Sequence, residues 1–234
     1  MPDSTHERRF FGMLVRRTGW RLSWPARLVV LMVLVVGALG FKGWIQPFLS
    51  LNAPLRGDYL VVEGWMPAYA IDDSTNEFKI GHYKKIITSG GQAKGQWSYE
   101  HNVTYALLAA EELQHIGFDT NSLACVPGPL TERDRTYHSA LAVRNWLDAN
   151  HLKPTSIDVL TLGAHARRSR MLFQEAMGDS VSVGVVCLVD DEYDRAHWWR
   201  SSEGVRETIS ESIAYFYAKL IFHPTRHPDE ANFQ

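Results

Sequence analysis

Four basic side chains lie in one short stretch of this sequence, and their positions suggest that they serve an anion. His165 is followed by Arg167, Arg168 and Arg170 at the predicted start of a helix. The helix dipole is positive at that end, so each cation there costs several tenths of a kcal/mol. We therefore expect a negative partner. It could be a ligand phosphate at the helix N-terminus, the acidic side chains of residues 190–194 as internal ion pairs, or both.

His165 is the candidate for proton transfer. An imidazole titrates near pH 6.5, so it can act as an acid or a base under ambient conditions. The neighbouring arginines are expected to lower the pKa of His165 and to favour the neutral base. Glu63 and Glu100 are the candidate carboxylate partners, which completes the predicted catalytic set. Two of the three also have a structural use, because His165 could cap a helix and the dipole favours Glu100 in a first turn.

Backbone amides and further arginines are the candidates for holding the anion. A serine and a glycine pair, residues 89–91, follow an apolar run, and glycine lets a phosphate approach the chain closely. An ordinary tight turn is the other use of such a pair. Residues 133–136 form a second polar segment, in which Asp134 is suited to cap a helix. The predicted ligand-binding residues are Ser89, Gly90, Gly91, Arg133, Asp134, Arg135, Thr136, Arg167, Arg168 and Arg170.

Other familiar motifs are missing from the sequence. It has neither the GxGxxG dinucleotide fingerprint nor a GxxxxGK[ST] phosphate loop, so no cofactor is predicted. Its 10 histidines form no HExxH or Cys–His grouping, so no metal site is predicted. Cys125 and Cys187 end two predicted strands that should lie on opposite edges of a sheet, too far apart for a disulfide. We expect two buried free thiols.

These residues need a scaffold, and the alternation of apolar runs with helical periods predicts one. A Rossmann-like, three-layer α/β/α fold with a five-stranded, mainly parallel sheet is expected. In such a sheet, ligands bind at the carboxyl ends of the strands, which is where the polar segments above fall. The predicted strands are 59–62, 85–88, 123–126, 157–162 and 181–188, and the predicted helices are 68–82, 99–116, 136–150, 166–177 and 203–222.

The N-terminal region has a different character. Residues 1–27 contain six arginines and two acids, and 14 residues without charge follow Arg27. Trp24 and Trp44 flank this run twenty residues apart, about 30 Å along a helix. We expect a single transmembrane anchor with the basic N-terminus in the cytoplasm and the domain exported. A cleaved signal peptide and a buried core helix are the alternatives.

The expected organisation is one globular domain on an appendage. The chain has 234 residues, of which 45% are hydrophobic, which excludes a disordered protein. Its net charge of −2 gives no reason to expect nucleic acid as a partner. The predicted segments are a basic cytoplasmic stretch at 1–27, an anchor at 28–46, a linker at 47–57, the α/β domain at 58–222 and a tail at 223–234.

Four segments, in order, resemble the DUF218 family of SanA/ElyC/YdcF-like envelope proteins. They are DYLVVEG at 58–64, KIITSGG at 85–91, RTYHSA at 135–140 and LGAHARR at 162–168. The resemblance implies a Rossmann-like domain, often anchored in the membrane, that takes part in bacterial envelope biogenesis. It covers about residues 58–178.

Together these features predict a protein of the inner membrane that binds an anionic small molecule or a lipid-linked substrate. The expected ligand is a phosphate-bearing envelope intermediate, either a lipid carrier or a glycan precursor. Acid–base chemistry would then perform phosphoester or pyrophosphate hydrolysis, or group transfer. The alternatives are a non-catalytic binding or assembly module and a Rossmann protein that binds a nucleotide such as S-adenosylmethionine. The sequence identifies no protein partner.

Overall fold

A computed structural model describes residues 8–9, 11, 14–16, 20–95, 98, 101–131 and 133–224. The chain divides into two compact units, Met1–Ile45 and Gln46–Gln234. Most of the long helix α1, Trp24–Leu49, belongs to the first unit, and its last turn belongs to the second. The two units are therefore linked by a continuous helix rather than by a loop.

The N-terminal unit consists of a small sheet and the apolar helix. Strands β1 (Arg8–Arg9), β2 (Leu14–Arg16) and β3 (Trp20–Leu22) pair antiparallel in that order. Helix α1 has 26 residues, about 39 Å, and its most apolar window has a mean hydropathy of 2.3. Only 6% of that window is buried, which argues against a soluble core helix. The helix contains the predicted segment 28–46 and is consistent with a single-pass anchor or a signal sequence.

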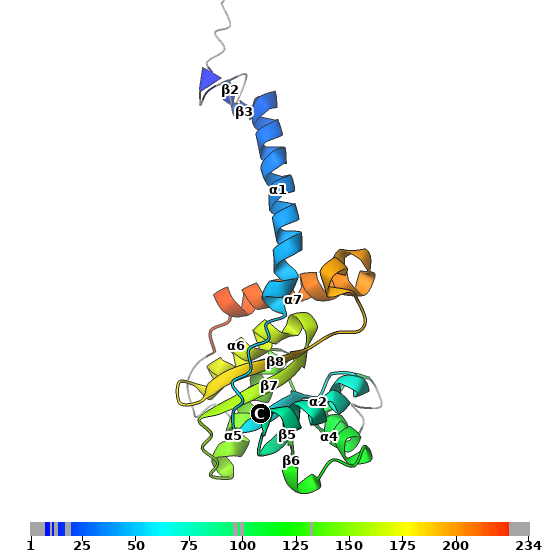
Figure 1. The fold of residues 1–234 in the computed structure, drawn as a ribbon. Helices are drawn as coiled ribbons and strands as arrows, with labels where there is room; N and C mark the ends of the chain where they lie inside the picture. The colour runs from blue at the N-terminus through cyan, green and yellow to red at the C-terminus, as the bar shows by residue number, and fades with distance from the viewer. Residues whose placement is uncertain are drawn as a thin grey trace, which may run out of the picture. The chain divides into compact units, whose positions relative to one another are not determined.

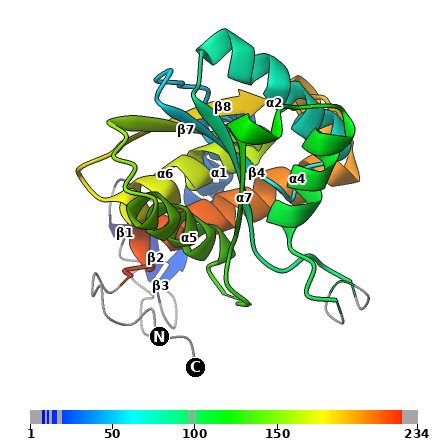
Figure 2. The same ribbon diagram turned by 90° about the horizontal axis from the view of Figure 1, so that it is seen from below.

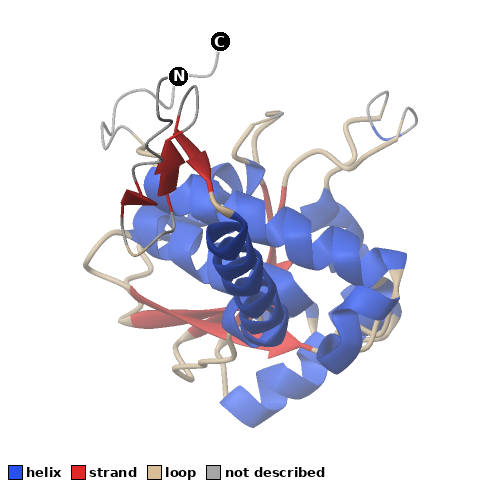
Figure 3. Ribbon diagram, turned by 90° about the horizontal axis from the view of Figure 1, so that it is seen from above, coloured by secondary structure: helices blue, strands red, loops and turns tan. Residues whose placement is uncertain are grey.

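An all-parallel sheet forms the centre of the second unit (Figures 1 and 3). In the described residues its order is β6-β5-β4-β7-β8, the doubly wound order in which the first strand in sequence is central. Every residue of β4 is buried, as expected where helices cover both faces. The strands are β4 (Tyr59–Glu63), β5 (Lys85–Gly90), β6 (Leu123–Pro127), β7 (Ser156–Leu162) and β8 (Ser182–Leu188), so all five predicted strands are confirmed.

Helices cover the two faces of this sheet (Figure 2). On one face, Val143 of α5 and Phe173 of α6 join the core. On the other face, Ile71 of α2 and Leu113 of α4 do so. The helices are α2 (Ala68–Gly81), α4 (Tyr105–His115), α5 (Arg135–Ala149), α6 (Ala166–Met177) and α7 (Ser202–Leu220), with short 3₁₀ turns η1 (Thr120–Ser122), η2 (Gly163–His165) and η3 (Arg195–Arg200).

Two predicted boundaries are wrong, each for a local reason. The helix expected from residue 99 begins at Tyr105, because the Thr104 side chain caps it by accepting a hydrogen bond from the Leu107 amide. The linker expected at 47–57 is not a free segment. Helix α1 continues to Leu49, and Ala53 pairs antiparallel with Val185 of β8.

The cysteines are free in the described chain, as predicted, and lie on the two edge strands β6 and β8. The expectation that both are buried is wrong. Cys125 is exposed, and Cys187 is half-buried. An edge strand leaves part of its surface uncovered, which explains the difference.

Helix α7 packs with its polar face inward. The predicted periodicity at 203–222 is confirmed as a helix, but its buried positions are Gly204, Thr208, Glu211 and Ser212. The apolar residues at spacings of three and four lie on the exposed side. The inward polar face therefore has a role other than forming a core.

Candidate functional site

A pocket of about 520 Å³ lies at the carboxyl edge of the sheet. This volume suits a small ligand. Its walls come from the ends of β4 and β5, from the first turns of α5 and α6, and from one side of α7. Polar residues that are distant in sequence meet there because parallel strands end at a common edge.

His165 is fixed at the bottom of this pocket by a carboxylate from α7. Its Nδ1 lies 2.9 Å from Oε1 of Glu211, 46 residues further along the chain. Gly163, with φ of 53°, turns the chain from β7 into the short helix that carries His165. This left-handed conformation favours glycine. The edge of the Trp65 ring packs against the imidazole, with the ring centroids 4.9 Å apart.

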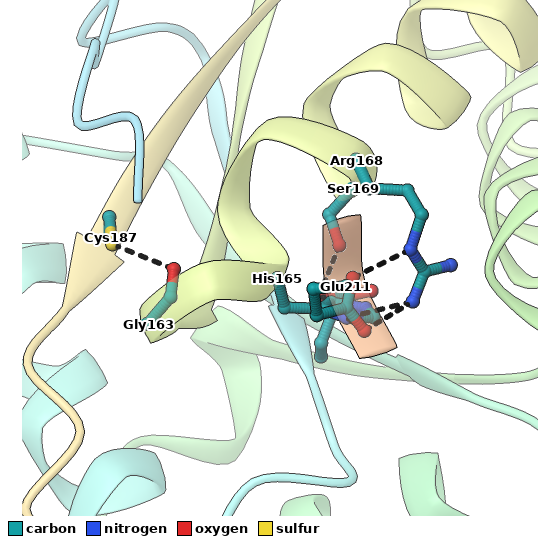
Figure 4. A network of polar contacts seen from close by, with 7 residues as sticks. Gly163, His165, Arg168, Ser169, Cys187 and Glu211 are labelled. Carbon is teal, nitrogen blue, oxygen red and sulfur yellow. Dashed lines mark hydrogen bonds and ion pairs between the residues drawn. The ribbon is translucent and has the colours of Figure 1, made fainter. Parts of the chain in front are cut away.

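Arg168 completes a charged cluster with the same carboxylate (Figure 4). Its Nε donates to Glu211 Oε2 at 2.8 Å and its Nη2 donates to Oε1 at 2.9 Å. A guanidinium that binds a carboxylate through two nitrogens is held in orientation as well as in place. Arg168 Nη2 also lies 2.9 Å from Nδ1 of His165, so two cations share one carboxylate.

The other imidazole nitrogen faces Glu63. His165 Nε2 lies 3.7 Å from Glu63 Oε2, which accepts a 2.8 Å hydrogen bond from Ser169 Oγ. This nitrogen is buried and has no hydrogen-bond partner among the described residues. An unpaired buried N–H is costly, so its retention at a pocket wall is a functional signal.

Two carboxylates keep His165 protonated. Burial lowers the pKa of His165, but Glu211 and Glu63 raise it and outweigh Arg168, bringing the pKa to about 9. The expectation that arginines would leave a neutral base is therefore wrong. Burial raises the pKa of Glu211, yet His165 and Arg168 hold it well below its ordinary value. Burial likewise raises the pKa of Glu63, and His165 lowers it overall. At neutral pH the imidazole is a proton donor.

Most of the predicted site residues meet in this pocket. The catalytic candidates Glu63 and His165 both line it. Glu100 lies outside the described residues. The ligand-binding candidates that line the pocket are Ser89, Gly90, Gly91, Asp134, Arg135, Thr136 and Arg168.

Three predicted arginines point elsewhere. Arg167 donates through Nε to the carbonyl of Phe48, and its guanidinium lies over that ring at 4.0 Å. Arg170 donates to the carbonyl of Val183 at 2.9 Å. Arg133 is exposed and is not part of the pocket wall. In the first turn of α6 the helix rotates successive side chains by about 100°, so only one of its three arginines can face the pocket.

The acidic residues of 190–194 do not pair with these arginines in the described chain. Asp190 accepts from the Glu192 amide at 3.0 Å, and Asp194 lies 2.6 Å from His197 Nδ1. The partner that sequence reasoning missed is Glu211. Its signal in the sequence was a row of three glutamates spaced by four along α7, Glu203, Glu207 and Glu211, on the side away from the apolar stripe.

Another part of the pocket wall, at the start of α5, offers backbone amide groups beside the charged side chains of Asp134 and Arg135. Asp134 occupies the N-cap position of α5 in a left-handed conformation, but its side chain makes no capping hydrogen bond to the described residues. The first-turn amides of α5 are thus not satisfied by that carboxylate. A helix N-terminus in this state binds anions.

The glycine pair has two different uses. A Cβ on Gly90 would come within 2.7 Å of the Tyr105 side chain, so this glycine is needed where α4 begins. A Cβ on Gly91 would meet only the Pro129 carbonyl, at 3.3 Å. Gly90 supports the structural alternative, whereas Gly91 is the position where a ligand can approach the backbone.

The rest of the site contains no arrangement suited to a metal. Within the described residues, no three His, Cys, Asp or Glu side chains are grouped so as to hold an ion.

No protein-family model matches this sequence, and no curated protein matches it. The resemblance to the DUF218 family therefore remains a prediction from four short segments.

Proposed function

We propose that this protein is a membrane-anchored envelope protein whose globular unit acts on a phosphate-bearing intermediate, such as a lipid carrier or a glycan precursor. The reaction class is phosphoester or pyrophosphate cleavage, or transfer of the phosphorylated group. A positioned acid, a set of anion-binding groups and a nearby carboxylate support this proposal.

The observation that carries this proposal is the environment of the His165 imidazole. Glu211 and Glu63 raise the pKa of the imidazole to about 9, the residue lines the pocket, and its buried Nε2 has no hydrogen-bond partner in the described chain. A general acid needs a bound proton, because it must pass to the leaving oxygen as the bond to phosphorus breaks. Glu211 holds the ring through Nδ1, and ionised Glu63 is the candidate base.

Anion binding would use the part of the pocket wall that is formed by the start of α5 and by Gly91. The α5 N-terminus and the Gly91 backbone lie in the same pocket as Arg135, whose side chain is exposed at the rim. The pairs His165–Glu63 and Arg168–Glu211 cancel in charge. An incoming phosphate would therefore be recognised by the amides and by Arg135.

The location follows from the N-terminal unit. Helix α1 is long and apolar enough to cross a bilayer, five arginines precede it, and a sixth, Arg27, lies in its first turn. The arginine excess favours a cytoplasmic N-terminus and an exported globular unit at the inner membrane. An anchor also holds the domain beside lipid-linked substrates, which raises their effective concentration.

Release of inorganic phosphate by the detergent-solubilised full chain tests the proposal. The substrates are phosphomonoesters, inorganic pyrophosphate and a polyprenyl pyrophosphate. His165→Gln is expected to lower kcat by about 100-fold or more, since that is the usual contribution of a general acid. Arg135→Gln should mainly raise KM. The matched control is Arg133→Gln, two residues away and outside the pocket, which should leave both constants unchanged. Equal activity of His165→Gln and the unaltered protein would refute the catalytic proposal.

A non-catalytic binding module is the second candidate, and the self-contained charge cluster favours it. Glu211 pairs with both His165 and Arg168, so the cluster is satisfied in part without a ligand. A binding module predicts that Arg135→Gln abolishes ligand retention while His165→Gln keeps both ligand and envelope function. Complementation of a deletion strain with the two variants separates the candidates.

A further inference from the structure

Helix α7 exposes a continuous apolar stripe. Val205, Ile209, Ile213, Phe216 and Leu220 are spaced by four, four, three and four residues, so they lie along one side of the helix. Each is between 37% and 68% exposed. Scattered apolar residues are normal on a protein surface, but a continuous stripe marks an interaction site.

The chain enters the globular unit beside this helix. The last turn of α1, Gln46–Leu49, is packed within that unit. Gln46 Nε2 donates to Tyr193 Oη at 2.6 Å, and the Phe48 ring packs edge-on against Tyr215 of α7 at 5.3 Å. The apolar segment thus ends at a residue that contacts α7. The first residues that follow the apolar segment in the chain therefore lie beside α7 in the globular unit.

The residues beside the stripe suit the surface of a bilayer. The stripe itself contains no charged residue. Arg206 and Lys219 are exposed near its two ends, where they can meet lipid phosphates.

We propose that α7 is an interfacial helix whose apolar stripe inserts into the surface of the bilayer that holds α1. This inference rests on the membrane anchor proposed above and does not depend on the reaction. It explains why α7 packs with its polar face inward, since the apolar face is covered by lipid. Glu207, Ser210 and Glu211, on other sides of α7, line the pocket. The pocket would then lie about one helix diameter, roughly 10 Å, from the lipid headgroups.

Nitroxide labels on the full chain in vesicles of phosphatidylethanolamine and phosphatidylglycerol test this inference. Single cysteines replace Ile213, Leu108 or Val33 in a Cys125→Ser, Cys187→Ser background. Leu108 is the matched control, because it is an exposed leucine on a different helix, α4. Val33 lies in α1 and reports insertion of the anchor. The measured quantity is the accessibility of each label to oxygen, which concentrates in lipid, relative to a water-soluble nickel reagent.

The label at Ile213→Cys should show an oxygen-to-nickel ratio several-fold above that of Leu108→Cys and below that of Val33→Cys. Equal ratios at Ile213→Cys and Leu108→Cys, with a high ratio at Val33→Cys, would overturn the inference and leave the anchor intact. A low ratio at Val33→Cys would reject the anchor, and this inference with it. Dipolar coupling between Ile213→Cys labels on two chains, with low oxygen access, would show a dimer interface and also overturn it.

Discussion

The two ends of the parallel sheet each bury a carboxylate, but they treat it differently. Near the amino ends, Asp158 of β7 is fully buried and accepts three hydrogen bonds. The donors are the Leu55 amide at 2.8 Å, the Gly57 amide at 3.2 Å and Tyr83 Oη at 2.7 Å. All three donors are neutral, and they come from residues 75 to 103 positions earlier in the chain, so Asp158 ties these segments to β7.

At the carboxyl ends, Glu63 belongs to a cluster of four ionised groups that borders a cavity. One hydroxyl donates to it, and its charged neighbour His165 retains an unpaired nitrogen. A buried polar group whose hydrogen bonds are all made within the protein contributes to stability. A buried polar group without a partner beside a pocket can still bond to a ligand. The comparison indicates a structural role for Asp158 and leaves the cluster around His165 as the candidate for the proposed function.

The largest expected effect is on stability and comes from Asp158→Ala. This change leaves two amides and a hydroxyl buried without an acceptor, and should cost about 4 kcal/mol of unfolding free energy. Chemical denaturation of the full chain in detergent measures it, with Asp148→Ala on the exposed side of α5 as the control. A loss below about 1 kcal/mol would contradict the structural role given to Asp158.

Glu211→Gln should have a slightly smaller effect on stability and a distinct effect on proton binding. It removes the shared anion from two buried cations and should cost about 3 kcal/mol. The pKa of His165 should fall, because burial and Arg168 both disfavour the imidazolium. NMR titration of the imidazole nitrogens measures this. Glu203→Gln on the same helix is the control, since Glu203 accepts a hydrogen bond from Ser202 and not from His165.

The pH dependence of stability should distinguish the carboxylate at the amino ends of the strands from the cluster at their carboxyl ends. The pKa of His165 is raised to about 9, so its contribution is complete below about pH 6.5 and is lost as the pH rises through about 9. The pKa values of Glu63 and Glu211 are lowered, so their contribution is present above about pH 4.5 and is lost as the pH falls. The free energy of unfolding, measured from pH 3 to pH 10, should therefore fall at both ends of this range.

His165→Gln provides the control for that experiment. The alkaline loss should be reduced in this variant, because the imidazole no longer titrates. Asp158→Ala should keep the alkaline loss while lowering stability at every pH. If His165→Gln retained the full alkaline loss, other groups would be its source and the imidazolium assignment would fail.

The smallest effects come from a matched pair of hydroxyl deletions. Tyr83→Phe and Ser169→Ala each remove one donor from a buried carboxylate, and each should cost about 1 kcal/mol. Ser169→Ala should raise the pKa of Glu63 and so alter the acid limb of the pH profile, because Ser169 and His165 both lower that pKa. Identical pH profiles for the two variants would remove the distinction between the ends.

The fold could be predicted from the sequence because its signals are local. Short apolar runs predicted the strands, and apolar residues at helical spacing predicted the helices. Both agree with the structure to within a few residues, except at the start of α4, which is set by its cap. The sheet order followed from the usual doubly wound topology. The edge-of-sheet rule then placed His165, Glu63 and Arg135 in one pocket.

The partners in the site could not be predicted in the same way. Glu211 reaches His165 only through the packing of α7, whose amphipathic pattern gives a helix but not the direction of its faces. The pKa of His165 depends on which charges are nearest in space, and the arginines nearest in sequence were a poor guide. Arg167 and Arg170 turn away because helix rotation allows one direction for each residue.

The bonds that residues 52–55 make to the parallel sheet protect one of its edges. Asn52 accepts from the Cys187 amide, Ala53 pairs with Val185, and Asp158 fixes Leu55. Residues 52–55 are therefore part of the globular unit. Ala53 covers part of the outer edge of β8, an edge that would otherwise be open to pairing with a strand of another chain.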